Sequence, residues 1–187
     1  MLAGLFGVGG GIIIDTPAGE CVLRHYRRGG MVAKLMGDHY LWSGADHTRS
    51  FAEFRLLALI ASLGLPSALP VACRYVRQGL FYTADLITRR IANAQTLAEC
   101  LASGQLDGEM AELVGALVAR FHRAGIWHAD LNAHNVLVTN DELYLIDNLL
   151  RLRRSLVKLG AAAQGEAAFE ESLWKPLAYR YERTLRA

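Results

Sequence analysis

Cysteine and proline are scarce in this chain, which has three cysteines and four prolines among 187 residues. Cys21, Cys73 and Cys100 are widely spaced and form no C-x-x-C pair, which argues against a zinc site and against a disulfide framework. We expect all three to be reduced core residues, as in proteins of a reducing cytoplasm.

Long apolar segments that cross or target membranes are also missing. The longest uncharged run, residues 56–73, contains Gly64, Pro66 and Pro70, so we expect a helix end, a turn and a strand start there. The apolar residues 1–14 have no basic n-region and are interrupted by glycines, which argues against a secretory signal.

A strong excess of one charge is absent. The formal net charge of +2 is too small to suggest general nucleic-acid binding. The arginines nevertheless cluster, and each cluster could face phosphates or an anionic membrane surface, or could form a solvated face. The clusters are Arg24 with Arg27 and Arg28, Arg89 with Arg90, for which we favour the solvated face, and Arg151 with Arg153 and Arg154.

Strand patterns dominate the first half of the chain. Residues 12–15 and 20–26 flank a Thr-Pro-Ala-Gly turn, and residues 71–76 and 80–87 flank a Gln-Gly turn. Between these pairs, residues 46–63 have the spacing of an amphipathic helix that Gly64 ends. The first half therefore predicts a small antiparallel sheet that carries one helix.

Helical patterns take over near residues 87–94, where we place a hinge between two lobes. Thr96 and Glu99 have capping-box spacing, and Asp107 can cap a helix that runs to about residue 123. Residues 149–159 and 166–184 also have helical patterns. We expect an α+β fold with two lobes sharing one cleft, an N-lobe over residues 1–90 and a mostly helical C-lobe over residues 91–187.

One polar motif of the second half suggests chemistry. His128-Ala-Asp130-Leu-Asn-Ala-His-Asn135 precedes two strand patterns, residues 136–138 and 143–146, and then Asp147. A hairpin there returns Asp147 beside Asn135. An Asp, an Asn five residues later and a second Asp after a hairpin is the order that protein-kinase-like folds use for one base and two magnesium ligands.

The motif therefore predicts phosphoryl transfer from ATP. Asp130 would take the proton of the substrate hydroxyl, His128 would brace the loop, and Asn135 and Asp147 would hold Mg²⁺. Turns also favour Asp, Asn and His, so the isolated H-x-D pattern alone is weak. His134 has no assigned role and is interpreted as a solvated or loop-packing histidine.

Nucleotide contacts are then expected from the first half. Gly9, Gly10 and Gly11 could let backbone amides approach the ATP phosphates, although a glycine cluster near a terminus equally fits flexible chain. Arg24 lies where a kinase-like fold carries its phosphate-contacting Lys, and Glu53 lies where the partner Glu would sit. The alternatives are that Arg24 covers the sheet and that Glu53 is an ordinary exposed helix residue.

Four segments together resemble the bacterial 3-deoxy-D-manno-octulosonic acid (Kdo) kinase family, with similarity over most of residues 21–158. The segments are Val22-Leu-Arg-His-Tyr-Arg-Arg-Gly-Gly30, Tyr40-Leu-Trp-Ser-Gly44, Arg49-Ser-Phe-Ala-Glu-Phe-Arg-Leu-Leu57 and the motif from His128 to Asn135.

The resemblance implies a protein-kinase-like fold and ATP-dependent phosphorylation of the 4-hydroxyl of a Kdo sugar. The acceptor would be a lipid A precursor, in lipopolysaccharide core assembly at the cytoplasmic face of the inner membrane. A peripheral enzyme at an anionic membrane surface is expected, with no nucleic-acid partner and no obligate protein partner. Arg27, Arg28 and Lys34 are candidates to meet the acceptor's carboxylate or phosphate groups, because of their charge near the expected cleft.

Two departures from the family pattern keep alternatives open. In the family the strand that ends in Ile-Asp continues as Ile-Asp-Phe-Asp, and a loop of a dozen or more residues then precedes a helix. Here Asn148, at the start of the similar helical segment, follows Asp147 directly. The chain also begins with less sequence ahead of the glycines than the family has. A small-molecule phosphotransferase of the aminoglycoside-kinase type is one alternative, and a pseudokinase that binds nucleotide without turnover is another.

Overall fold

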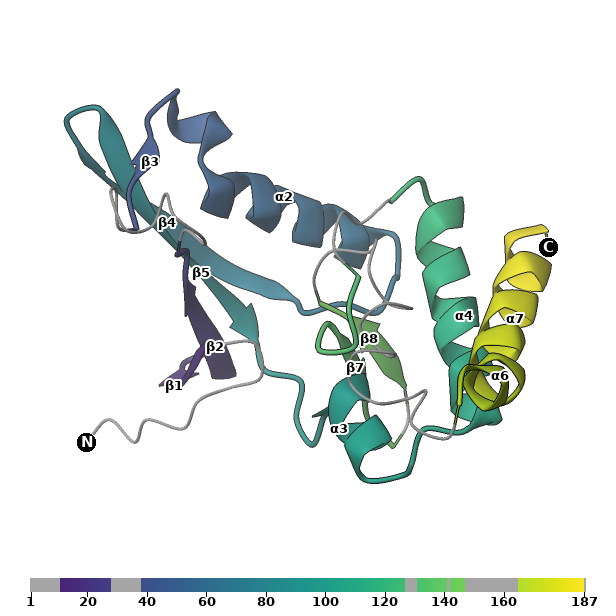
Figure 1. Ribbon diagram of the computed structural model, residues 1–187. Coiled ribbons are helices and arrows are strands. Elements are labelled where there is room, and N and C mark those ends of the chain that lie inside the picture. The colour runs from purple at the N-terminus through teal and green to yellow at the C-terminus, as the bar shows by residue number, and fades with distance from the viewer. Residues whose placement is uncertain (1–10, 28–37, 127–130, 141, 147–164, 187) are drawn as a thin grey trace. The chain divides into compact units, whose positions relative to one another are not determined.

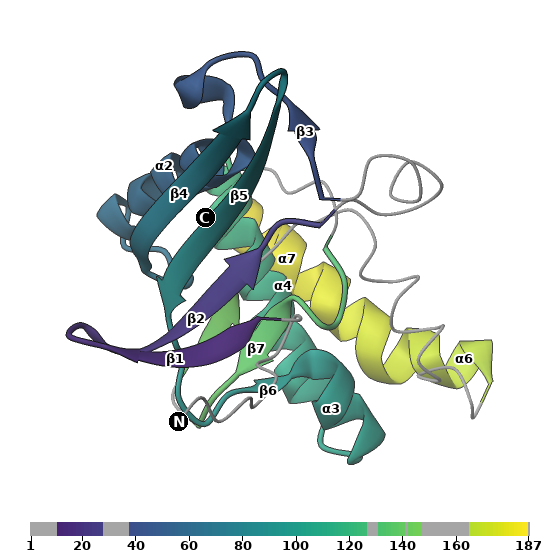
Figure 2. The ribbon, with the colours of Figure 1, turned by 90° about the vertical axis from the view of Figure 1, so that its left-hand side faces the viewer.

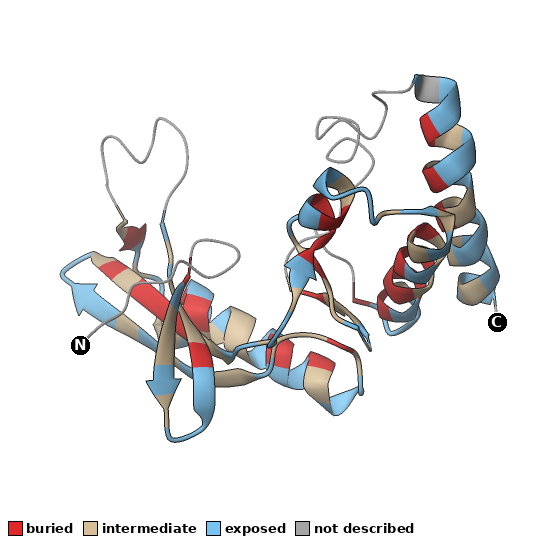
Figure 3. Ribbon diagram, turned by 90° about the horizontal axis from the view of Figure 1, so that it is seen from below, coloured by how far each residue is buried: buried red, intermediate tan, exposed pale blue. Residues whose placement is uncertain are grey.

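The computed structural model describes residues 11–27, 38–126, 131–140, 142–146 and 165–186. Contacts divide the chain into two compact units. The first contains Met1–Gly64 and Ala68–Ile91, and the second contains Leu65–Ser67 and Ala92–Ala187. Each unit has its own buried residues, shown in red in Figure 3.

The first unit is built on a five-stranded antiparallel sheet in which β5 is the central strand. Strand β1 (Ile12–Thr16) pairs with β2 (Gly19–His25), and β2 pairs with β5 (Phe81–Arg89). Strands β4 (Pro70–Gln78) and β3 (Tyr40–Leu41) also pair with β5. The predicted β1–β2 and β4–β5 hairpins are both present, and Gly79 adopts the positive φ of 61° that the second turn requires.

Helix α2 (Arg49–Ser62) lies along one face of this sheet (Figures 1 and 2). It buries Leu57 and Ile60, and Ala84 and Leu86 of β5 are also buried. A short 3₁₀ turn, Ala45–His47, precedes the helix, so the helix begins later than the sequence pattern predicts. The predicted end holds, since Gly64 follows with a φ of 65°.

The second unit combines three short strands with helices. Strand β7 (Val136–Val138) pairs with both β6 (Gln95–Thr96) and β8 (Leu143–Leu145) in an antiparallel sheet. Helix α3 (Leu97–Ala102) begins with the predicted capping box, and Asp107 caps α4 (Gly108–Arg123) through the amide of Met110.

The C-terminal helical region packs on α4. It consists of α6 (Glu166–Phe169), a π-helical turn (Glu170–Trp174) and α7 (Lys175–Arg186). Gly115 of α4 faces the backbone of α7, and His122 Nδ1 lies 2.8 Å from the Tyr181 hydroxyl. Burial lowers the pKa of His122, which favours its neutral form at this helix contact.

The observed α+β architecture, with a small antiparallel sheet carrying one main helix, confirms the predicted fold class. The helix predicted over residues 149–159 lies outside the described residues. No helix in the described part of the chain is long and apolar enough to cross a bilayer.

Candidate functional site

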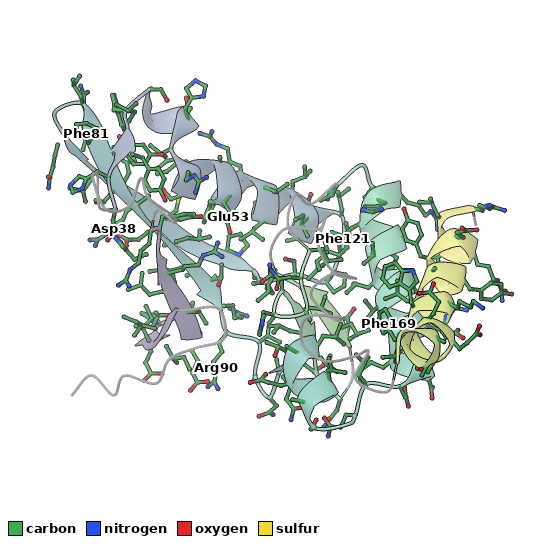
Figure 4. The ribbon with its side chains drawn as sticks, in the orientation of Figure 1. Asp38, Glu53, Phe81, Arg90, Phe121 and Phe169 are labelled. Carbon is green, nitrogen blue, oxygen red and sulfur yellow. The ribbon has the colours of Figure 1, made fainter. Side chains whose placement is uncertain are left out.

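Arg24 of β2 and Glu53 of α2 form an ion pair in the first unit. The Tyr26 hydroxyl donates a second hydrogen bond to the other Glu53 oxygen, and the Arg24 guanidinium lies 5.4 Å from the centre of the Tyr26 ring. Burial, together with the Glu53 carboxylate, raises the pKa of Tyr26, which keeps its hydroxyl a donor. The structure thus brings together the two nucleotide candidates that the sequence places on a strand and a helix. Glu53 is labelled in Figure 4.

This pair positions a cation without burying it completely. The side chains of Arg24 and Glu53 are 29% and 26% exposed. A guanidinium offers several N–H donors in a fixed plane, so it can keep Glu53 as a partner and still bind a phosphate oxygen. The geometry fits an anionic phosphate ligand beside Arg24.

A second charged cluster of the first unit centres on Asp85 of β5, which sequence reasoning missed. Asp85 is only 6% exposed. Its carboxylate accepts a 2.6 Å hydrogen bond from Arg74 Nε and lies 2.7 Å from His25 Nδ1. His25 Nε2 in turn lies 3.5 Å from Asp38. Burial disfavours the ionised carboxylate, but the hydrogen bonds from Arg74 and His25 outweigh it and lower the pKa of Asp85.

The loop that ends at Asn135 is fixed by its own backbone and by α3. Leu131 and Ala133 are buried, and the Ala133 carbonyl accepts a 3.0 Å hydrogen bond from the amide of Ala98. The Asn132 side chain accepts from the His134 amide at 2.9 Å, an Asx turn, while the Asn132 carbonyl accepts from Asn135 at 3.0 Å. Asn135 therefore enters β7 from a defined turn.

The β7–β8 hairpin then returns the chain to Asn135. The Ile146 amide donates a 3.0 Å hydrogen bond to the Asn135 carbonyl, so Ile146 is held beside Asn135. Ser67 and Pro66 fix the end of β8 through hydrogen bonds of 2.7 and 3.1 Å to the carbonyl and amide of Leu145. Asp147, the next residue in the chain, lies outside the described residues.

Asn135 suits a magnesium ligand, because Mg²⁺ prefers hard oxygen donors and both backbone groups of Asn135 are anchored. No group of three or more His, Cys, Asp or Glu side chains among the described residues has a geometry that could hold a metal ion. The magnesium site that the sequence predicts at Asn135 and Asp147 stays a prediction, because Asp147 is outside the described residues.

Comparison with known proteins decides the family. The sequence profile of the lipopolysaccharide kinase (Kdo/WaaP) family matches residues 6–166. A protein of Stenotrophomonas maltophilia (strain K279a) named 3-deoxy-D-manno-octulosonic acid kinase is 45% identical over 183 residues, 88% of this chain and 71% of its own length. A protein of the same name from Xanthomonas campestris pv. campestris (strain B100) is 46% identical over 172 residues, 82% of this chain and 68% of its own length.

The chain belongs to the lipopolysaccharide kinase (Kdo/WaaP) family. The resemblance in the Arg-rich segment and the His128 to Asn135 motif is therefore confirmed at the level of the family. Family membership makes the chain a phosphotransferase with a hydroxyl acceptor.

The alignment with the Stenotrophomonas protein contains residues of the relative that this chain lacks. The alignment with the Stenotrophomonas protein runs over 183 residues, whereas 88% of 187 residues is about 165. About 18 residues of the relative thus have no counterpart here.

Several predicted kinase residues fall outside the described part of the chain: Gly9, Gly10, Arg28, Lys34, His128, Asp130 and Asp147. Arg27 is exposed just after β2. Gly11 is buried, and a Cβ there would collide with Val22 and lie 3.2 Å from the Leu23 carbonyl. Close packing against β2 is therefore enough to explain a glycine at position 11, without a contact to a ligand.

Proposed function

We propose that this chain is an ATP-dependent kinase that phosphorylates the 4-hydroxyl of a Kdo sugar on a lipid A precursor, in lipopolysaccharide core biosynthesis. The observation that carries the proposal is the 45% identity, over 88% of the chain, to a relative named as a kinase of this sugar. The lipid-linked acceptor and the choice of hydroxyl come from the resemblance to the Kdo kinase family.

The proposed chemistry lies in the C-lobe, residues 91–187. Asp130 accepts the proton of the attacking hydroxyl, and His128 holds the loop in position. Asn135 and Asp147 are the proposed Mg²⁺ ligands. When bound, Mg²⁺ neutralises charge on the transferring phosphates. The hydrogen bond between Ile146 and Asn135 supports this assignment, because it places the residue before Asp147 against the loop that carries Asn135.

The proposed nucleotide contacts lie in the N-lobe, residues 1–90. Arg24 binds a phosphate group while Glu53 orients its guanidinium, and Gly9, Gly10 and Gly11 let the backbone approach the phosphates. Arg27, Arg28 and Lys34 are proposed to hold the carboxylate or phosphate groups of the acceptor.

The proposed location is the cytoplasmic face of the inner membrane, with peripheral attachment to its anionic surface. A lipid-linked acceptor requires the enzyme to work at a bilayer. No nucleic acid and no obligate protein partner is part of the proposal.

The decisive experiment measures phosphate incorporation into a Kdo-bearing lipid A precursor with ATP and Mg²⁺. We expect Asp130→Ala to lose at least about a hundredfold in rate, because the base is gone. Asp46→Ala, which removes an exposed carboxylate of the first unit, is the control and should keep full rate. Equal incorporation by wild type and Asp130→Ala would contradict the assignment of the base.

A pseudokinase is the second candidate, favoured by the roughly 18 residues that the relatives have and this chain lacks. It predicts nucleotide binding by the wild type with no incorporation into the Kdo acceptor. Insertion of the relative's residues after Asp147 would then restore turnover. Measurable turnover by the wild type excludes this candidate.

A further inference from the structure

The turn end of the β4–β5 hairpin carries apolar side chains that the fold leaves in solvent. Leu80 in its turn is 72% exposed and Leu41 of the adjoining β3 is 62% exposed, the two highest values among the large apolar residues described. The Trp42 amide donates to the Leu80 carbonyl at 2.9 Å, and Leu41 pairs with Phe81. Four neighbouring residues at one end of the sheet thus carry large apolar side chains. Phe81 among them is labelled in Figure 4.

Strand alternation places further groups around this end. Val76, 43% exposed, pairs with Thr83 and so shares the face of Phe81 and Leu41. On the opposite face the Arg77 guanidinium lies 5.0 Å from the centre of the Trp42 ring. We call Leu41, Trp42, Val76, Arg77, Leu80 and Phe81 the hairpin-end surface.

Among the described residues near this surface, arginines without an acidic partner outnumber carboxylates without an arginine partner. Asp46 is paired with Arg55, and Asp38 lies 3.5 Å from His25. Arg77 and Arg49 each lie over an aromatic ring, at 5.0 and 5.1 Å, and have no acidic partner among the described residues. An anionic partner therefore complements this end of the sheet.

We propose that the hairpin-end surface docks the enzyme on an anionic phospholipid bilayer. Leu41, Leu80 and Phe81 enter the boundary between headgroups and acyl chains, while Arg77 binds lipid phosphates. The Trp42 ring packs on Tyr75 and Tyr82, with ring centres 4.9 and 6.0 Å apart, and holds Arg77 at this end of the sheet. The inference rests on the proposed function for its biological sense, because a lipid-linked acceptor must be reached at a membrane.

A bilayer fits this surface better than a protein does. A stable protein interface takes about 20–30 residues from each side, far more than a hairpin end supplies. Peripheral binding instead needs only a few apolar side chains and a few cations. Each cation near an anionic surface and each buried methylene adds to the free energy of membrane binding.

The test is co-sedimentation of the full chain with vesicles of phosphatidylglycerol and phosphatidylethanolamine, compared with phosphatidylcholine vesicles. We expect preference for the anionic vesicles, and about a tenfold weaker partition for the Leu41→Ser/Leu80→Ser double variant. Arg77→Gln should weaken binding about fivefold on anionic vesicles only. The matched control is Leu59→Ser/Leu113→Ser, since both of these leucines are 51% exposed and lie outside the surface.

Three results would overturn the proposal. The first is unchanged vesicle binding by the Leu41→Ser/Leu80→Ser variant. The second is equal binding of the wild type to anionic and neutral vesicles. The third is a wild type that binds no vesicles but self-associates through this surface, so that the double variant abolishes the self-association. Circular dichroism verifies the fold of each variant, and Leu80→Ser alone replaces the double variant if that one misfolds.

Activity on a soluble, deacylated Kdo acceptor separates this inference from the proposed function. The double variant should keep wild-type rate on the soluble acceptor and lose rate only on a vesicle-embedded acceptor. A wild type inactive on both acceptors contradicts the proposed function, whereas the vesicle measurement still decides the surface.

Discussion

Glu53 is the residue on which the Arg24 cluster depends, since its two oxygens accept from Arg24 and from Tyr26. Glu53→Gln keeps the size of the side chain and removes its charge. We expect it to lower the free energy of unfolding by about 1–3 kcal/mol, because two partly buried donors lose a charged acceptor. Urea denaturation measures this, and an absorbance titration should show a lower pKa for Tyr26 than in the wild type.

The control for Glu53 is the other ion pair of α2, between Arg55 and Asp46. Their side chains are 55% and 76% exposed, so Asp46→Asn should cost less than about 1 kcal/mol. Equal losses from the two substitutions would show that Glu53 has no special structural role.

Asp85 predicts a pH dependence of stability. Its folded-state pKa lies below the ordinary value of 3.8, so the stability it contributes is present above about pH 4 and is lost as the pH falls further. Asp85→Asn should therefore flatten the fall in unfolding free energy as the pH is lowered from about 4 to about 2. A series of denaturation curves over this range measures the slope. If the slope of unfolding free energy against pH is unchanged in Asp85→Asn, other carboxylates cause the loss of stability in acid.

The two clusters also show what single residues reveal before a structure is known. The positions of Arg24 and Glu53 follow from a strand and a helix of a recognisable pattern, so their proximity could be anticipated. Asp85 lies within an apolar strand and meets His25, 60 residues away, and Arg74, 11 residues away. Nothing in the local sequence announces these partners, because only the register of three strands brings them together.

Among the elements, the contact between α4 and α7 depends on one missing side chain. A Cβ on Gly115 would overlap the Leu177 carbonyl oxygen and lie 3.0 Å from its carbon and 3.1 Å from the Tyr181 amide nitrogen. Gly115→Ala gains about 1 kcal/mol of helix propensity, but it must push two backbones apart. We expect a net loss of about 1–3 kcal/mol, measured by thermal unfolding.

The matched control for Gly115 is Leu113→Ala on the exposed side of the same helix. It should leave stability unchanged or raise it slightly, by helix propensity alone. Stabilisation by Gly115→Ala would contradict the close approach of the two helices.

Local signals predict most of the elements, and non-local pairing accounts for those that were missed. The capping box of α3 and both hairpins of the first sheet rest on residues close in sequence. Strands β3 and β6 have two residues each and exist only through their partners, β5 and β7. The π-helical turn Glu170–Trp174 interrupts a pattern that otherwise predicts one continuous helix.

For the whole molecule, nucleotide binding should raise the unfolding temperature. A ligand at one hundred times its dissociation constant stabilises the folded state by about 2.7 kcal/mol. We expect ATP with Mg²⁺ to do so in the wild type and in Asp130→Ala alike, because the base is not needed for binding. AMP, which lacks the terminal phosphates, is the control and should stabilise less. No shift with ATP in either protein would contradict both the kinase and the pseudokinase.

One trait of the whole molecule lies beyond sequence patterns. Residues 65–67 occupy a turn between a helix and a strand of the first unit, yet they belong to the second. A pattern of apolar and turn residues identifies the turn correctly, but it cannot identify the strand end that the turn will bond.

The hydrogen bonds from Leu65–Ser67 to β8 have a consequence for biosynthesis. Ser67 and its acceptor Leu145 are 78 residues apart, so at about 5–20 residues per second a ribosome needs roughly 4–16 seconds to deliver the second after the first. Within that interval β5 is synthesised and the first sheet can form. Pro66 and Ser67 remain without their β8 partner until Leu145 has been synthesised. No single cut of the gene yields either unit whole, because the tripeptide that completes the later unit is encoded inside the earlier one.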